Sequence, residues 1–124
     1  MAVPLVMVVE DEEGLLRLFG SMIERMGYRV LLAWGGAEAL DLLNDETPNL
    51  VVLDMAMPNV NGIAVLRHMN SVPRLDETRV MVLTAIGPGP APADVHDRIG
   101  LWVNKPVHPD TFRHLIRRML SDGC

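Results

Sequence analysis

Cysteine and aromatic residues are scarce in this chain of 124 residues. The single cysteine, Cys124, is the last residue, so no disulfide can form within the chain, and this usage fits a reducing compartment. Aromatic residues make up 4% of the sequence and hydrophobic residues of all kinds 49%, which predicts an aliphatic core. A chain of this length buries roughly two-thirds of its unfolded surface, so it needs neither a disulfide nor a structural metal to fold.

Positive charge and long apolar runs are lacking as well. Lysine and arginine number 11 against 16 acidic residues, and the net charge of -5 argues against general nucleic-acid binding. No apolar run approaches the length of a membrane span, and the N-terminal MAVPLVMVVEDEE lacks the basic start of a signal peptide. We therefore expect a cytoplasmic protein that consists of one domain, residues 1–124, and binds no membrane. Because no DNA-binding segment follows residue 121, we also expect that it binds no promoter.

Short apolar runs that are rich in valine and leucine and do not alternate are typical of strands covered on both faces. Five of them occur, at residues 4–9, 29–34, 49–53, 79–83 and 101–103. Apolar residues at helical spacing lie between or after them, at residues 12–26, 36–44, 62–70 and 109–121. This alternation predicts an α/β fold with a doubly wound, five-stranded parallel sheet and helices on both faces.

Residues 86–100, IGPGPAPADVHDRIG, should contain the fourth helix but begin with three prolines and two glycines among seven residues. Proline lacks the backbone donor that a helix interior needs, so a helix can start only near Pro92 or Ala93. About two turns then fit before Gly100. We expect a long loop and a fourth helix that is short or irregular and poorly anchored.

Polar residues stand at the ends of four of the five predicted strands. The first strand ends in Glu10-Asp11, the third in Asp54, the fourth in Thr84 and the fifth in Lys105. The second ends in AWG, residues 33–35, without a reactive group. The carboxyl ends of parallel strands share one edge of the sheet, and ligands bind there where the strand order reverses. If the second strand is an outer one, the other four bring three carboxylates, a hydroxyl and an ammonium group together.

Three carboxylates at one place repel one another and need a cation. Oxygen ligands with open positions suit Mg²⁺, which keeps several waters and uses few carboxylates. Lys105 can hold a phosphate as a point charge, and Thr84 can donate a hydrogen bond to the same group. Phosphoryl transfer requires mainly alignment and charge neutralisation, and an aspartate can be its nucleophile. Asp54, on the central strand of the set, is the candidate phosphoacceptor.

A series of short motifs carries a resemblance to a known family. The motifs are Glu10-Asp11, the string DMAMPNVNG with Asp54, Met57-Pro58 and Asn61-Gly62, then Thr84-Ala85, and finally Lys105-Pro106. Together with the stretch GGAEALDLLNDETPNLVVLD, they make almost the whole chain resemble the receiver domain of two-component response regulators, in its single-domain, chemotaxis-regulator-like form. The resemblance implies a flavodoxin-like sheet with the strand order 2-1-3-4-5.

The resemblance also implies roles in phosphorylation. Asp54 would accept a phosphoryl group from a partner histidine kinase or histidine phosphotransfer protein. Glu10, Asp11 and Asp54, with the backbone carbonyl of Ala56, would bind Mg²⁺. Such a domain assists its own phosphorylation and dephosphorylation and is not a turnover enzyme.

Signal output is implied in the same way. Thr84 and Lys105 would contact the phosphoryl group, and Thr84 and Trp102 would act as switch residues. The face made by the fourth helix, the fifth strand and the fifth helix would then change its preference for a downstream protein. The sequence does not identify that protein, the kinase or the oligomeric state.

Plainer interpretations stay open for several of these residues. Glu10-Asp11 could cap the first helix, Asp54 could start a turn, and Trp102 could be a packed core aromatic. The basic residues of the last predicted helix form either a solvated face or a docking face; they are Arg113, His114, Arg117 and Arg118.

Two other functions also stay open. An aspartate-dependent phosphatase usually has a second aspartate two residues after the nucleophile, where this chain has Ala56. The other is an interaction module of receiver type that is not phosphorylated, which the complete acidic set disfavours.

Overall fold

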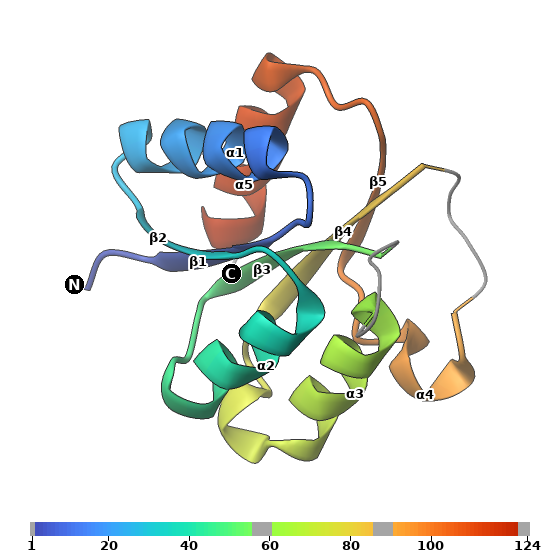
Figure 1. The fold of residues 1–124 in the computed structure, drawn as a ribbon. Coiled ribbons are helices and arrows are strands. Elements are labelled where there is room, and N and C mark those ends of the chain that lie inside the picture. Colours follow the sequence, from blue (N-terminus) through green and yellow to red (C-terminus); the bar gives the residue numbers. More distant parts are fainter. Residues whose placement is uncertain (1, 56–60, 86–90, 122–124) are drawn as a thin grey trace.

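The computed structural model describes residues 2–55, 61–85 and 91–121. Five parallel strands form one sheet in the order β2-β1-β3-β4-β5, as predicted (Figure 1). The strands are β1 (Leu5–Val9), β2 (Arg29–Ala33), β3 (Leu50–Asp54), β4 (Arg79–Thr84) and β5 (Leu101–Asn104). The outer strands are β2 and β5, and the strand order reverses between β1 and β3.

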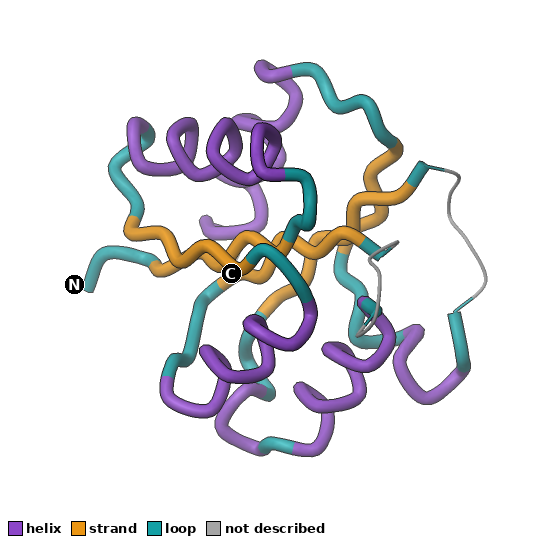
Figure 2. Tube along the Cα trace, in the orientation of Figure 1, coloured by secondary structure: helices purple, strands orange, loops and turns teal. Residues whose placement is uncertain are grey.

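Helices cover both faces of the sheet (Figures 1 and 2). On one face lie α1 (Glu13–Arg25) and α5 (Pro109–Ser121). On the other lie α2 (Gly36–Asp45), α3 (Gly62–Ser71), α4 (Ala93–His96) and a 3₁₀ turn, η1 (Pro73–Leu75). In the part of the chain that the structure describes, no helix has the length and apolar character needed to cross a membrane. The doubly wound α/β prediction is confirmed.

Two apolar clusters, one on each side of the sheet, hold the helices in place. Along β1, Val8 belongs to the cluster beneath α1 and α5, and its neighbour Met7 to the cluster beneath α2 and α3. Every residue of β1 and of β3 is buried. Both faces of these strands are therefore covered, and this explains why they are continuous apolar runs in the sequence.

The fourth helix is even shorter than predicted. α4 comprises four residues, about one turn instead of two. Its N-cap residue, Pro92, provides no side-chain hydrogen bond to the first turn. Four residues after the helix, the backbone N–H of Gly100 already donates to the carbonyl of Val80 at 2.9 Å. The chain must leave the helix early in order to join the sheet as β5.

The prediction that this helix is poorly anchored is wrong. Arg67 Nε in α3 donates to Asp94 Oδ2 at 2.8 Å, and Asn70 Nδ2, also in α3, donates to the Asp94 carbonyl at 2.9 Å. Val95 is fully buried in the cluster beneath α2 and α3. One turn of helix is too short to be stable by itself. These contacts with α3 and with the apolar core therefore hold α4 in place.

Arg74, in the 3₁₀ turn that the sequence analysis did not predict, binds the C-terminal end of α2. Its Nη2 donates to the carbonyls of Leu43 at 2.5 Å and Asn44 at 3.2 Å, and its Nη1 donates to the Glu46 carbonyl at 2.7 Å and to Thr47 Oγ1 at 2.5 Å. The last carbonyls of a helix have no partner within it. One guanidinium group therefore completes the end of α2 and ties it to the segment before β4.

Replacing Arg74 with lysine should lower the free energy of unfolding by about 1–2 kcal/mol, because an ammonium group cannot reproduce the planar fork of donors. Arg25→Lys, at an exposed position in the last turn of α1, is the control and should change it by less than about 0.5 kcal/mol. Urea unfolding of the three proteins measures the difference. Equal midpoints for both variants would contradict this role of Arg74.

Candidate functional site

The register of the sheet brings the predicted acidic residues together. Val9 of β1 pairs with Leu53 of β3, so Glu10 and Asp54 are the next residues on two neighbouring strands. Asp54 is itself the last residue of β3 rather than the first residue after it. Both lie at the point where the strand order reverses, which is where open parallel sheets bind ligands.

The hydroxyl and ammonium residues come from the next two strands. Thr84 is the last residue of β4 and pairs with Asn104 of β5. The backbone N–H of Lys105, the residue after β5, donates to the Thr84 carbonyl at 2.8 Å. The side chain of Lys105 extends from there towards β1 and β3. All four strand ends predicted to carry chemistry therefore meet at one edge.

Glu10, Asp11 and Asp54 form a cluster that could hold a metal ion. Each offers a carboxylate oxygen, and these oxygens lie within 4.8 Å of one another. Glu10 is 1% exposed and Asp54 3%, whereas Asp11 is exposed. Among the described residues this is the only such group of acidic, histidine or cysteine side chains. Two buried oxygen donors and one exposed donor suit a hard cation that keeps part of its water shell.

The capping interpretation of Glu10-Asp11 is wrong. The residue that caps α1 is Glu12, whose carboxylate accepts hydrogen bonds from the backbone N–H groups of Gly14 at 2.9 Å and Leu15 at 3.0 Å. Glu10 instead accepts the Glu12 N–H at 3.2 Å. The cap thus leaves Glu10 and Asp11 available to the cluster. The residues alone did not show which of the consecutive acids would be the cap.

Lys105 lies between the two buried carboxylates. Its Nζ is 3.1 Å from Glu10 Oε1 and 3.1 Å from Asp54 Oδ2. Burial alone would lower the pKa of Lys105, but the hydrogen bonds and negative charges of Glu10 and Asp54 outweigh it and raise the pKa. The lysine therefore stays charged. The sequence predicts that Lys105 contacts a phosphate, but it does not show that Lys105 also neutralises these two acids.

Burial raises the pKa of Glu10 to about 7. The Glu12 N–H and the ammonium of Lys105 favour the ionised form, while the negative charge of Asp54 disfavours it. A carboxyl group removed from water prefers to be neutral unless a positive charge compensates it. One lysine shared by two acids compensates only in part. Binding of a cation would therefore release a proton from this group at moderately acidic pH.

The start of α3 lies against the end of β3. Asn61 caps the helix, its Oδ1 accepting the Ala64 N–H at 3.2 Å. At Gly62 a Cβ atom would lie 3.1 Å from Met55 Cα and 3.3 Å from the Asp54 carbonyl oxygen. A larger residue would require these backbone atoms to shift by a few tenths of an ångström, so glycine is favoured at this close approach. An Asn-Gly pair before an apolar helical pattern is the sequence signal from which the helix cap and the close approach could have been predicted.

Other predicted residues are placed less decisively. Ala56 and Met57-Pro58 lie outside the described residues, so the metal-binding carbonyl of Ala56 stays a prediction. Trp102 is half-buried and packs against the cluster beneath α2 and α3, in agreement with a core role. Its role as a switch stays a prediction.

On α5, Arg113 forms an ion pair with Asp110. The rest of the predicted basic patch is exposed: His114, Arg117 and Arg118.

The fold and the site together define a flavodoxin-like α/β protein with an acidic cluster and a lysine at its switch point. A family model described as "Response regulator receiver domain" matches residues 6–117, so the chain belongs to the response regulator receiver family.

Similar proteins agree with this assignment. The polar-differentiation response regulator DivK of Brucella anthropi is 31% identical over 123 residues, covering 95% of this chain and 97% of DivK. The probable transcriptional regulator ycf27 of Cyanophora paradoxa is 37% identical over 122 residues, which are 93% of this chain but 47% of that protein. A solved receiver domain of a sensor histidine kinase from Pseudomonas aeruginosa, with a magnesium ion coordinated in its active site cleft, has the same fold. Its TM-score is 0.82 at 18% identity, covering 97% of this chain and 99% of that one.

The stability of the metal-free protein should fall as pH rises from about 5 to about 8. The pKa of Glu10 is about 7 in the folded protein against 4.5 in an unfolded chain, so the folded state binds the proton more tightly. The resulting stabilisation is fully present below pH 4.5 and is lost as pH passes 7, by roughly 1–3 kcal/mol. Urea unfolding in EDTA at several pH values measures it. Glu10→Gln should lack this component, and an unchanged slope in the variant would refute the assignment.

Replacing Lys105 with methionine should destabilise the metal-free protein by roughly 2–4 kcal/mol, because it leaves two buried carboxylates without their counter-charge. Saturating Mg²⁺ should then raise the melting temperature of the variant more than that of the wild type. Arg17→Met is the control, because it breaks an exposed pair with Glu13 and should cost less than about 0.5 kcal/mol. Equal Mg²⁺ responses in Lys105→Met and wild type would show that the lysine does not compensate this cluster.

Proposed function

We propose that the chain is a phosphoacceptor: Asp54 receives a phosphoryl group, in the presence of Mg²⁺, from a histidine kinase or a histidine phosphotransfer protein. One observation carries this proposal. Lys105 lies 3.1 Å from both Glu10 and Asp54, beside the exposed carboxylate of Asp11. A structural ion pair needs one acid, whereas here two acids share one lysine and a third acid lies near them at the ligand-binding edge of the sheet. The protein consumes one phosphoryl group per cycle and is not a turnover enzyme.

The donor set fits Mg²⁺. Glu10, Asp11 and Asp54 would hold the ion, and the carbonyl of Ala56 would add a further oxygen. When bound, the ion neutralises negative charge on the oxygens of the transferred phosphoryl group. The residues of the chain supply the rest: Glu10 and Asp11 keep the pocket polar and anionic, and Lys105 holds the Asp54 carboxylate in place.

The chemical step requires little from the protein beyond alignment. One oxygen of Asp54 attacks the phosphorus atom in line with the bond to the donor histidine. A phosphorus–oxygen bond forms, and the phosphorus–nitrogen bond breaks with its electron pair remaining on the imidazole nitrogen. The product is an acyl phosphate on Asp54. Phosphoryl transfer depends on positioning and charge neutralisation more than on acid–base catalysis, which suits a site of carboxylates and one lysine.

Phosphorylation would change the charge balance of the site. A phosphoryl group adds about 1.5–2 negative charges, and Lys105 then has a stronger partner than Glu10. We propose that Lys105 and Thr84 move onto the phosphoryl group and that the face formed by α4, β5 and α5 changes its affinity for a downstream protein. Such a local change of charge biases an element between two arrangements. A histidine kinase draws on cytoplasmic ATP, so the proposal places this chain in the cytoplasm.

Asp54→Asn should abolish phosphorylation while leaving the fold intact, because asparagine has nearly the same shape but no nucleophilic carboxylate. Wild type treated with acetyl phosphate and Mg²⁺ should gain the mass of one phosphoryl group, and EDTA should prevent the gain. Asp41→Asn, at an exposed position of α2, is the control and should be labelled like wild type. Intact-protein mass spectrometry measures all four samples. Equal labelling of Asp54→Asn and wild type would disprove the site.

A further inference from the structure

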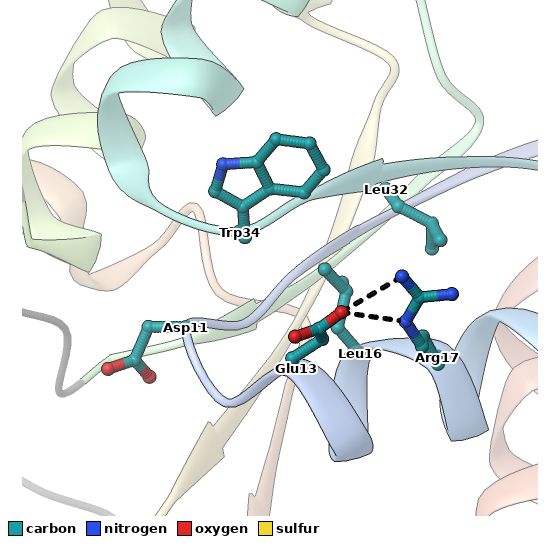
Figure 3. Close-up of a pocket in the computed structure, with 6 residues that line it drawn as sticks. All are labelled: Asp11, Glu13, Leu16, Arg17, Leu32 and Trp34. Atoms are coloured by element: carbon teal, nitrogen blue, oxygen red, sulfur yellow. Dashed lines mark hydrogen bonds and ion pairs between the residues drawn. The ribbon is translucent and has the colours of Figure 1, made fainter.

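An exposed tryptophan next to the acidic site has no role in the function proposed above. Trp34 follows β2 and is 65% exposed. Its ring borders a cavity of about 510 Å³ between α1 and β2 (Figure 3). The lining residues are Asp11, Glu13, Leu16, Arg17, Leu32 and Trp34. Single exposed apolar side chains are ordinary on protein surfaces, but a concave site with an apolar floor and a few polar groups is typical of a binding site.

The cavity and the carboxylate cluster share one residue. Asp11 belongs to both, because it lines the cavity and also offers an oxygen to the cluster with Glu10 and Asp54. The backbone gives a second connection: the N–H of Glu10 donates to the carbonyl of Ala33, the residue before Trp34, at 3.0 Å. Trp34 therefore follows a strand end that lies beside Glu10, at the same edge of the sheet as Asp54.

The backbone beneath the ring is fixed. The Trp34 N–H donates to Glu38 Oε1 of α2 at 2.9 Å, and the preceding Ala33 is fully buried. On the opposite side of the cavity, Glu13 and Arg17 of α1 form an ion pair of 2.9 Å (Figure 3). The site thus exists before anything binds, so little ordering is required when the ring is covered.

The surroundings of the cavity are predominantly acidic. Asp11, Glu12 and Glu13 begin the α1 side, and Glu38 accepts the Trp34 N–H; among the residues that line the cavity the one basic group, Arg17, pairs with Glu13. Negative charge of this kind selects a partner surface with basic groups and raises its rate of association. It disfavours a free anionic metabolite, which would be repelled by the same carboxylates.

We infer that this cavity receives one apolar side chain of the protein that donates the phosphoryl group, with basic residues of the donor facing the carboxylates around Trp34. The inference rests on the proposed function, which requires a histidine-bearing protein to reach Asp54. Tryptophan is among the residues that most often dominate the binding energy at the centre of an interface. Trp34 then determines which donor is used, and the chemistry at Asp54 proceeds without it.

Phosphotransfer profiling tests the inference. Transmitter domains of the histidine kinases of the source organism are autophosphorylated with radiolabelled ATP, and the one that phosphorylates the wild type fastest is selected. Trp34→Ser should lower kcat/KM with that kinase by about tenfold or more, whereas Trp34→Phe should keep most of it. Val3→Ser is the matched control, since Val3 is an exposed apolar residue before β1, at the opposite edge of the sheet.

Acetyl phosphate separates docking from chemistry because it is too small to use the cavity and Asp54 together. Its rate of labelling should agree within about twofold between wild type and Trp34→Ser. An equal loss with acetyl phosphate, or no loss with the kinase, would overturn the inference and leave the proposed function standing. Labelling of wild type by acetyl phosphate but by no kinase would also overturn it. Absence of labelling at Asp54 by every donor would refute the proposed function itself.

Discussion

Two buried carboxylates that share one ammonium group are the interaction on which the rest of this site depends. Glu10 and Asp54 are almost completely removed from water. Lys105 Nζ lies 3.1 Å from a carboxylate oxygen of each residue. One positive charge cannot compensate two negative ones, and Asp11 adds a third. The pocket is therefore deficient by about the charge of a divalent cation. Burial is the main cause of the raised pKa of Glu10, and the uncompensated charge of Asp54 adds to it.

The parallel register of the sheet makes this arrangement possible. Glu10 and Asp54 are neighbours only because Val9 pairs with Leu53, and Lys105 reaches them only because β5 lies beyond β4 in the same direction. A slip of one residue in any of these strands would turn its terminal side chain to the other face of the sheet. The apolar runs that fill both faces therefore have a second effect, because they also fix the position of each polar residue at the edge.

The strands and the polar residues at their ends were predictable from local pattern. Valine-rich runs predicted the strands, and the polar residues at their ends predicted that Glu10, Asp11, Asp54, Thr84 and Lys105 would meet. Contacts between side chains away from the strand ends were not predictable in this way. The bond from Arg67 to Asp94 joins residues 27 positions apart, and neither residue type is unusual at its place. Trp34 was dismissed as unreactive, since an apolar ring shows a role only once a cavity appears beside it.

The attachment of α4 to α3 has an evolutionary consequence. A helix of one turn has almost no stability of its own, so its position depends on Arg67 and Asn70 of α3 as well as on its own Asp94 and Val95. Substitutions at these two positions of α3 would shift α4 even though the sequence of α4 itself had not changed. Selection on the position of α4 would therefore also act on residues of α3, the helix that follows β3 and Asp54 in the chain.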